Sequence, residues 1–138
     1  MTDAPAGEPP EVIPGLGRLR AETRARASEP YLLTVTSGGR PHCGTVTVTW
    51  DDDRLAVWPV PRKWAEAEAA GYRQVTLLWP PSEPGGYNLI IDGTAARGQA
   101  NDDQALLVTV TRAVLHRRGA APATSGSSCG SDCVPLTG

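Results

Sequence analysis

The chain has 138 residues, a length that favours a single domain with its own hydrophobic core. Hydrophobic residues make up 40% of it and charged residues 20%, as in globular rather than disordered proteins. The formal net charge of −2 argues against general binding to nucleic acid or to anionic membranes. No stretch approaches the roughly 20 apolar residues of a membrane span, and the N-terminus lacks the pattern of a signal peptide. A cytoplasmic protein without nucleic-acid or membrane partners is therefore expected.

Composition divides the chain into three parts. Residues 1–15 contain four prolines and are expected to be a flexible lead-in, while residues 16–118 carry the pattern of a folded domain. Residues 119–138 are rich in Ala, Pro, Gly and Ser, and are expected to pack loosely. This tail holds Cys129 and Cys133, for which a small-loop disulfide, a redox pair and part of a metal site all remain open.

Apolar periodicity within residues 16–118 predicts two short helices and six strands. In chain order these are a helix over 16–28, strands over 31–36, 42–50 and 55–60, a helix over 63–70 ended by Gly71, and strands over 75–79, 87–95 and 106–116. The acidic groups at 51–53 and 101–103 are expected to be turns. Many short strands that must avoid exposed edges suggest a small closed or split β-barrel.

The strand predicted over 42–50 alternates strictly. Val46, Val48 and Trp50 share one face, and threonines, Thr45 among them, share the other. Pattern alone favours an ordinary strand with Val inward and Thr outward, although the Thr face offers hydroxyl groups to a ligand.

A basic turn precedes the second predicted helix. Lys63, the only lysine in the chain, follows Arg62 where a strand gives way to a helix. Free backbone N–H groups and the positive end of the helix dipole gather at such a position, so two cations there make a candidate phosphate site. A solvated turn is the alternative, and the local sequence alone favours it, since surface cations are mostly unpartnered.

Other candidate residues are fewer. The chain has four Trp and no Phe, so Trp is expected to supply most large aromatic packing; at least three of the four are assigned to the core or an interface, and Trp58 is the candidate exception. His42 and His116 lie on different predicted strands, which leaves haem ligation open without favouring it. No spacing of residues indicates a catalytic triad or a metal site, and no catalytic residue is assigned.

The order of these elements resembles the pyridoxamine 5′-phosphate oxidase-like FMN-binding split-barrel family. The resemblance rests on residues 31–42 (Tyr-Leu-Leu-Thr-Val-Thr-Ser-Gly-Gly-Arg-Pro-His), 53–65 (Asp-Arg-Leu-Ala-Val-Trp-Pro-Val-Pro-Arg-Lys-Trp-Ala), 75–80 (Val-Thr-Leu-Leu-Trp-Pro) and 87–95 (Tyr-Asn-Leu-Ile-Ile-Asp-Gly-Thr-Ala). It implies a homodimer that binds flavin mononucleotide (FMN) between its subunits.

The resemblance also implies roles for individual residues. Arg62 and Lys63 match an Arg-Lys pair that holds the flavin phosphate. Trp58 and Pro59 match a strand end that lies along the flavin. Thr45 matches the inner strand of a hairpin, and Asn88 matches an amide that approaches the flavin from the partner subunit.

The chain also departs from that family's oxidase. The oxidase has an Arg on the inner strand, but the matching position in this chain, near Gly44, has no cation. The C-terminal substrate-binding segment of the oxidase also has no counterpart here. Oxidation of pyridoxamine phosphate is therefore not expected. What remains is a flavin-dependent oxidoreductase of unassigned substrate. The alternative is a non-catalytic protein that stores flavin or binds haem or the deazaflavin F420.

Overall fold

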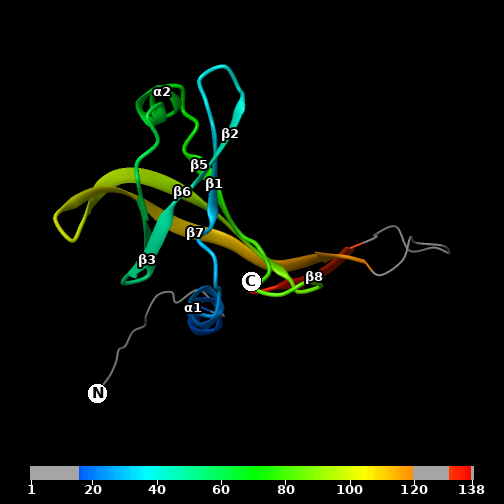
Figure 1. The fold of residues 1–138 in the computed structure, drawn as a ribbon. Coiled ribbons are helices and arrows are strands. Elements are labelled where there is room, and N and C mark those ends of the chain that lie inside the picture. Colours follow the sequence, from blue (N-terminus) through cyan, green and yellow to red (C-terminus); the bar gives the residue numbers. More distant parts are fainter. Residues whose placement is uncertain (1–15, 120–130, 138) are drawn as a thin grey trace, which may run out of the picture.

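A computed structural model of the chain describes residues 16–119 and 131–137, which form a mainly β protein with two short helices (Figure 1). The elements are α1 (Leu16–Arg24), β1 (Tyr31–Val35), β2 (Pro41–Thr45), β3 (Thr47–Asp51), β4 (Arg54–Trp58), α2 (Trp64–Ala69), β5 (Gln74–Trp79), β6 (Asn88–Ala100), β7 (Asp103–Arg118) and β8 (Ser131–Pro135). The mainly β class predicted from the sequence is confirmed. With nine residues in α1 and six in α2, neither helix of the described part has the length and apolar character to cross a membrane.

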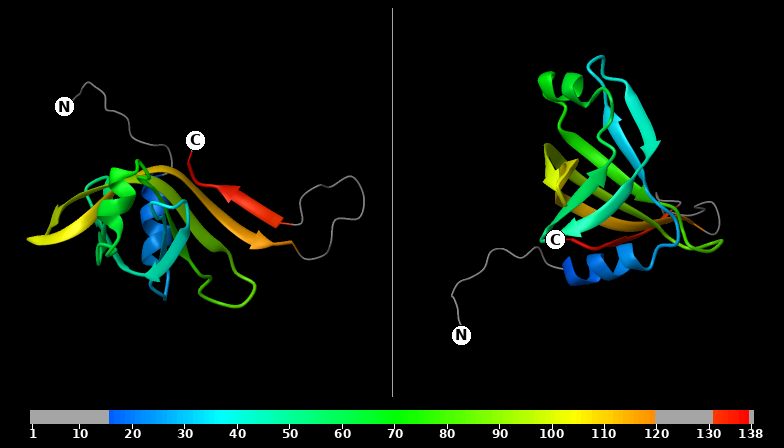
Figure 2. Two further views of the ribbon diagram at one scale, coloured as in Figure 1. Left: turned by 90° about the horizontal axis from the view of Figure 1, so that it is seen from above. Right: turned by 60° about the vertical axis from the view of Figure 1, so that its left-hand side comes forward.

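All eight strands of the described residues belong to one sheet, in which neighbouring strands are antiparallel. The order is β2-β1-β5-β6-β7-β4-β3, with β8 paired to β7. The strands at the two ends of this order, β2 and β3, are separated in the chain only by Val46, whose N–H donates to the carbonyl of Pro30 (3.1 Å). The chain therefore passes from one end of the sheet directly to the other, and Figure 2 shows the sheet curving to allow it.

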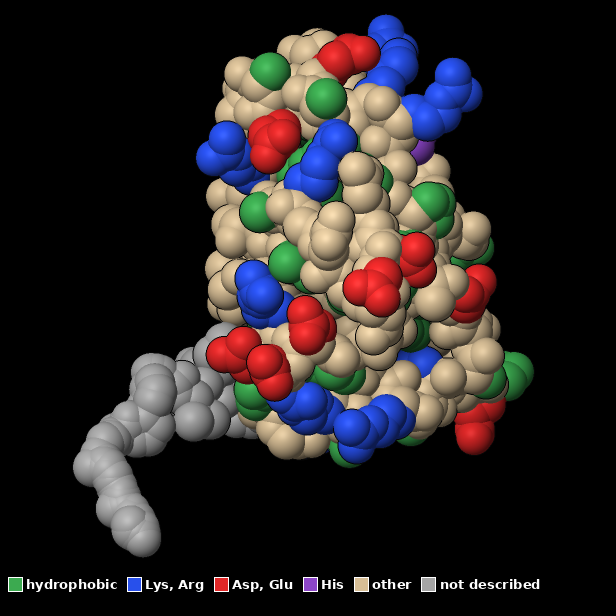
Figure 3. All heavy atoms as spheres, turned by 90° about the vertical axis from the view of Figure 1, so that its left-hand side faces the viewer, with side chains coloured by type: hydrophobic (Ala, Val, Ile, Leu, Met, Phe, Trp, Pro, Cys, Tyr) green, Lys and Arg blue, Asp and Glu red, His purple; other side chains and the backbone are tan. Residues whose placement is uncertain are grey.

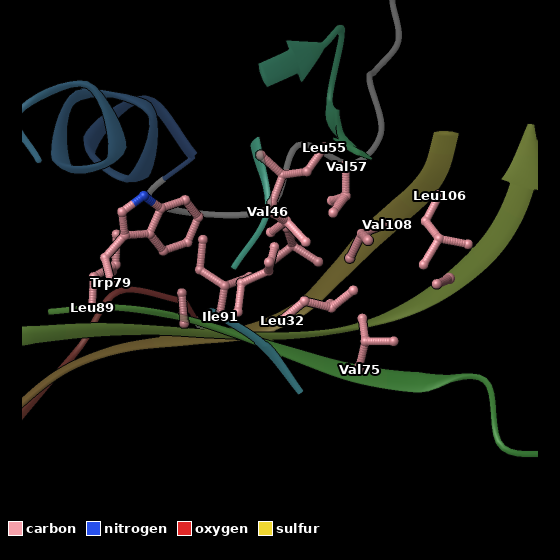
Figure 4. Packing of buried hydrophobic residues seen from close by; sticks show 14 of the residues in the cluster. Leu32, Val46, Leu55, Val57, Val75, Trp79, Leu89, Ile91, Leu106 and Val108 are labelled. Atoms are coloured by element: carbon pink, nitrogen blue, oxygen red, sulfur yellow. The ribbon is translucent and has the colours of Figure 1, made fainter. Parts of the chain in front are cut away.

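The core fills the concave side of this curved sheet. Alternate residues of the strands point inward and are buried there (Figure 4). Among them are Leu32, Leu55, Val57, Leu77, Leu89, Ile91, Leu106 and Val108. Both helices add buried side chains, Leu19 from α1 and Trp64 with Ala67 from α2, so both are anchored to the same core.

The predicted turns occur where the sequence placed them. Asp52 (φ 57°) lies in the two-residue turn between β3 and β4, and Asn101 (φ 53°) and Asp102 (φ 67°) form the turn between β6 and β7. Asn and Asp tolerate this left-handed conformation better than other non-glycine residues, which explains their presence here. Gly71 (φ 88°) ends α2 as predicted.

The prediction of a single strand over 42–50 is wrong. This segment forms two strands, β2 and β3, with different partners: β2 pairs with β1, and β3 pairs with β4. The predicted faces are nevertheless correct on the β3 side of the break, because Val46 is buried, Val48 and Trp50 are half-buried, and Thr47 and Thr49 are exposed.

The tail was also predicted wrongly in its last part. Ser131–Pro135 forms β8, which pairs with the end of β7, and Leu136 is only 5% exposed and belongs to the main core. Cys133 lies exposed on β8, whereas the lead-in 1–15 and Cys129 lie outside the described residues.

Candidate functional site

A pocket of about 780 Å³ lies between the β1–β2 hairpin and the segment that joins β4 to α2. The hairpin contributes one wall and the joining segment with the start of α2 contributes the other. The lining residues are Thr34, Val35, Thr36, Arg40, Pro41, His42, Pro59, Val60, Pro61, Arg62, Lys63, Trp64, Glu66 and Ala67. This volume falls within the roughly 300–1,000 Å³ of typical small-molecule sites.

The charged groups in this lining are mostly cationic. Arg40, Arg62 and Lys63 are exposed cations, whereas Glu66 is the single carboxylate among the lining residues. None of the three cations forms an ion pair within the described residues. Figure 3 shows Lys and Arg side chains, with a histidine beside them, at the end of the molecule where α2 and the hairpin lie. The pocket is therefore suited to an anionic group.

The wall formed by the joining segment is held in place by Trp64. This residue begins α2, is only 1% exposed, and packs with Ala67 in the core. Its backbone N–H donates to the carbonyl of Pro61 (3.0 Å), which folds the chain into a tight turn around Arg62 and Lys63. The two cations consequently sit on a turn whose following residue is fixed in the core.

The helix itself contributes less than the sequence predicted. Lys63 is the N-cap rather than the first helical residue, and α2 is six residues long. Since the N–H of Trp64 is already bonded within the turn, it is not free for a ligand. The positive character of this end of the pocket therefore rests on the Arg62 and Lys63 side chains more than on the helix dipole.

The structure brings together only part of the predicted site. Pro59, Arg62 and Lys63 line the pocket. Thr45 lies exposed at the end of β2, and Asn88, at the start of β6, donates through Nδ2 to the carbonyl of His116 (3.3 Å); neither lines the pocket.

Trp58 precedes the pocket wall without lining it. It is half-buried, packs against the small cluster of Ala56, Ala100 and Ala105, and its buried Nε1 has no hydrogen-bond partner among the residues that the structure describes. The other three Trp confirm the assignment to packing: Trp64 and Trp79 are buried in the core, and half-buried Trp50 packs against it.

Sequence reasoning missed two residues of the pocket. The sequence patterns place Arg40 between two predicted strands without a role, and His42 on a strand as an open haem ligand, but both line the wall opposite Arg62 and Lys63. The available signal was the hairpin itself, because β1 and β2 pair as far as Val35 and Pro41, which places Arg40 at the tip of a wall.

A second pocket, of about 600 Å³, lies on the convex side of the sheet around β1, β5 and β6. A row of side chains crosses the strands on this side, with Tyr31 opposite Leu78, Leu78 opposite Ile90, and Ile90 opposite Val114. Tyr31 is 39% exposed, and Leu78 and Ile90 are half-buried. This convex apolar row therefore remains partly uncovered within one chain.

The described residues contain no group of three or more His, Cys, Asp or Glu side chains placed to hold a metal ion. Cys43 is exposed on β2, and Cys133 is exposed on β8, at the other side of the sheet order. The role of the pair Cys129 and Cys133 is not decided, because Cys129 lies outside the described residues.

The fold and the pocket define a mainly β protein with one curved antiparallel sheet and a pocket lined by basic residues. No family model matches the chain. It is 41% identical over 118 residues to an uncharacterized protein of Mycobacterium bovis and, to the same extent, to an uncharacterized protein of Mycobacterium tuberculosis, with 75% of this chain and 82% of each relative covered. The chain belongs to the same family as these two mycobacterial proteins.

Proposed function

We propose that this protein binds FMN as a homodimeric split barrel, with the flavin phosphate on Arg62 and Lys63. The observation that carries the proposal is the basic pocket, in which these two residues are joined by Pro59 and an apolar wall. Apolar lining with a few convergent polar groups is the general character of cofactor sites. The resemblance of roughly residues 30–118 to FMN-binding split barrels selects FMN among anionic ligands.

The sheet supports the barrel part of this proposal. Its two end strands, β2 and β3, are consecutive in the chain and joined through Val46. A sheet whose ends are linked in this way is readily closed, and closure would remove its exposed edges.

The convex apolar row supports the homodimer. Exposed Tyr31 and half-buried Leu78 and Ile90 present apolar surface that a second copy would cover. Asn88 lies at the start of β6, the strand that contributes Ile90 to this row, and it does not line the chain's own pocket. In a dimer, Asn88 would reach the flavin of the partner subunit, as the resemblance implies.

The residues present fit a flavin phosphate. Arg offers a planar fork of donors and Lys a compact charge, and both bind phosphate oxygens through charge-assisted hydrogen bonds. Pro59 and Val60, which follow the end of β4, would contact one side of the ligand. When bound, FMN supplies hydride-transfer chemistry, and this chain's residues bind it, orient it and exclude water. The activity proposed is that of a flavin-dependent oxidoreductase.

The first test is an absorbance spectrum of the purified, dialysed protein, with light scattering of the same sample to report a dimer mass. Flavin bands, present on isolation or after addition of FMN, would support the proposal, and a Soret band would instead support haem on the pocket residue His42. A deazaflavin would be distinguished by its own absorbance. A colourless protein that takes up no added FMN would refute flavin binding.

The second test removes the two cations. The double substitution Arg62→Ala and Lys63→Ala should weaken FMN binding at least about a hundredfold, because each charge-assisted hydrogen bond contributes on the order of 1.5–3 kcal/mol. Arg54→Ala with Arg97→Ala is the matched control, since both residues are exposed, lie outside both pockets and carry the same total charge. Equal affinities of the two double variants would remove the phosphate assignment.

A further inference from the structure

We propose that Arg40 is a third phosphate-binding residue of this pocket and binds the ligand from the wall opposite Arg62 and Lys63. The inference rests on the proposed function, and it assigns a role to a residue that the Arg-Lys pair does not include. Arg40 would also take the place of the cation that the chain lacks near Gly44, since Arg40 lines the pocket and Gly44 does not.

The backbone of Arg40 is held in place by the hairpin turn. The N–H of Thr36 donates to the carbonyl of Arg40 (2.9 Å), and the N–H of Gly39 donates to the carbonyl of Thr36 (2.9 Å). Gly39 adopts φ 77°, a conformation that favours glycine, and Pro41 restricts Arg40 to extended backbone. The side chain is therefore attached to a fixed point at the pocket wall, so ordering it on a ligand costs side-chain entropy alone.

The two walls face each other across the pocket and already make one contact. Ser37, in the hairpin turn, donates a hydrogen bond to Oε1 of Glu66 on α2 (3.5 Å). The hairpin tip therefore approaches α2 closely enough for a ligand to touch both. A phosphate between the walls would receive hydrogen bonds from Arg62 and Lys63 on one side and from Arg40 on the other.

Charge balance favours this arrangement over an unliganded surface arginine. Three cations face one carboxylate, Glu66, in the lining, and none of the three is ion-paired within the described residues. A phosphate monoester carries close to two negative charges near neutral pH. Such a group would offset most of the mutual repulsion that the three cations impose on one another.

The test compares two ligands that differ only in the phosphate. FMN and riboflavin are titrated into the wild-type protein, Arg40→Ala, Arg40→Lys and the control Arg54→Ala. We expect Arg40→Ala to raise the Kd for FMN about tenfold or more, the effect of one charge-assisted hydrogen bond at an exposed position, and to leave the Kd for riboflavin unchanged. Arg40→Lys should recover part of the loss, and Arg54→Ala should behave as wild type.

The outcomes separate this inference from the proposed function. If the wild-type protein binds FMN and Arg40→Ala binds it equally well, or loses FMN and riboflavin alike, the role of Arg40 is refuted while flavin binding stands. If the wild-type protein binds no FMN, both proposals fall. Because Arg40 is exposed, its removal should not alter the thermal midpoint, which serves as the check on folding.

Discussion

Gly93 lies at a β-bulge, where the register between β6 and β7 shifts between Asp92 and Gly93. A Cβ built on Gly93 would lie 2.4 Å from the carbonyl oxygen of Thr109 and 2.6 Å from Cγ1 of Val108. Both atoms belong to β7, and the nearer one is backbone. Substitution Gly93→Ala therefore requires the two longest strands of the sheet to separate locally.

The size of the effect follows from which atoms must move. Overpacking a well-packed interior costs roughly 1–3 kcal/mol, and a backbone oxygen in a paired strand cannot turn aside as a side chain can. We therefore expect Gly93→Ala to lower the free energy of unfolding by about 2–3 kcal/mol. Urea unfolding should show a lower midpoint with an unchanged slope, since the surface exposed on unfolding remains the same.

Two other glycines provide graded controls. At Gly98 the nearest atom is Cδ1 of Leu107 (2.5 Å), the far end of a flexible side chain, so Gly98→Ala should cost less than Gly93→Ala. A Cβ built on Gly44 would meet no atom of the described residues within 4 Å apart from its chain neighbours, and Gly44→Ala should change stability by less than about 0.5 kcal/mol. Equal stabilities of the Gly93 and Gly44 variants would refute the close approach of β7 to the bulge.

Two further predictions concern the attachment of the chain ends. Arg26, whose side chain is only 7% exposed, donates to the carbonyls of Pro80 (3.3 Å) and Tyr87. Arg26→Ala should lower the free energy of unfolding by about 2–4 kcal/mol, because both carbonyls lose a donor. Glu22→Ala, which removes only the ion-pair partner of Arg26, should cost less, and an equal or larger cost for Glu22→Ala would contradict this. On β8, the hydrogen bond from the Tyr87 hydroxyl (2.6 Å), followed by that from Arg117 Nε (2.9 Å), lowers the pKa of Asp132. Since the folded-state pKa lies below the unfolded one, this contribution is present above the ordinary pKa of 3.8 and is lost as pH falls through the lowered value. The protection factors of the β8 amides, which correct for the intrinsic pH dependence of exchange, should therefore fall in that acid range. In Asp132→Asn they should be low already at neutral pH, and identical protection factors in the two proteins would exclude Asp132 as the attachment.

Local patterns were sufficient to predict most of the elements. Alternating apolar residues identified the strands, and the turns at Asp52 and at Asn101–Asp102 followed from residues that tolerate positive φ. The break at Val46 could not be predicted in the same way. A strand that leaves one partner and joins another keeps its alternation, because side chains still point to opposite faces. Only the hydrogen-bonded pairing of the strands in the structure shows the change of partner.

The last strand escaped prediction for a different reason. Residues 119–138 have the composition of a loosely packed tail, yet Leu136 is buried in the core and Val134 packs against it. Two apolar side chains among Gly, Ser and Pro are too few to make a periodic signal. Their role depends on the last part of β7, which lies beyond the residues that pair with β4 and therefore has a free edge with which β8 pairs.

The candidate site shows the same distinction between local and distant information. The Arg62-Lys63 pair is recognisable in the sequence because its residues are adjacent, but adjacency alone favours a solvated turn. What favours a ligand is that a separate segment about 20 residues earlier places Arg40 and His42 on the facing wall of the same pocket. Cations on one wall can avoid each other by turning to solvent, whereas cations on two facing walls share the space between them. An anion in that space can be reached from both sides, so the affinity should depend on the hairpin as well as on the turn before α2.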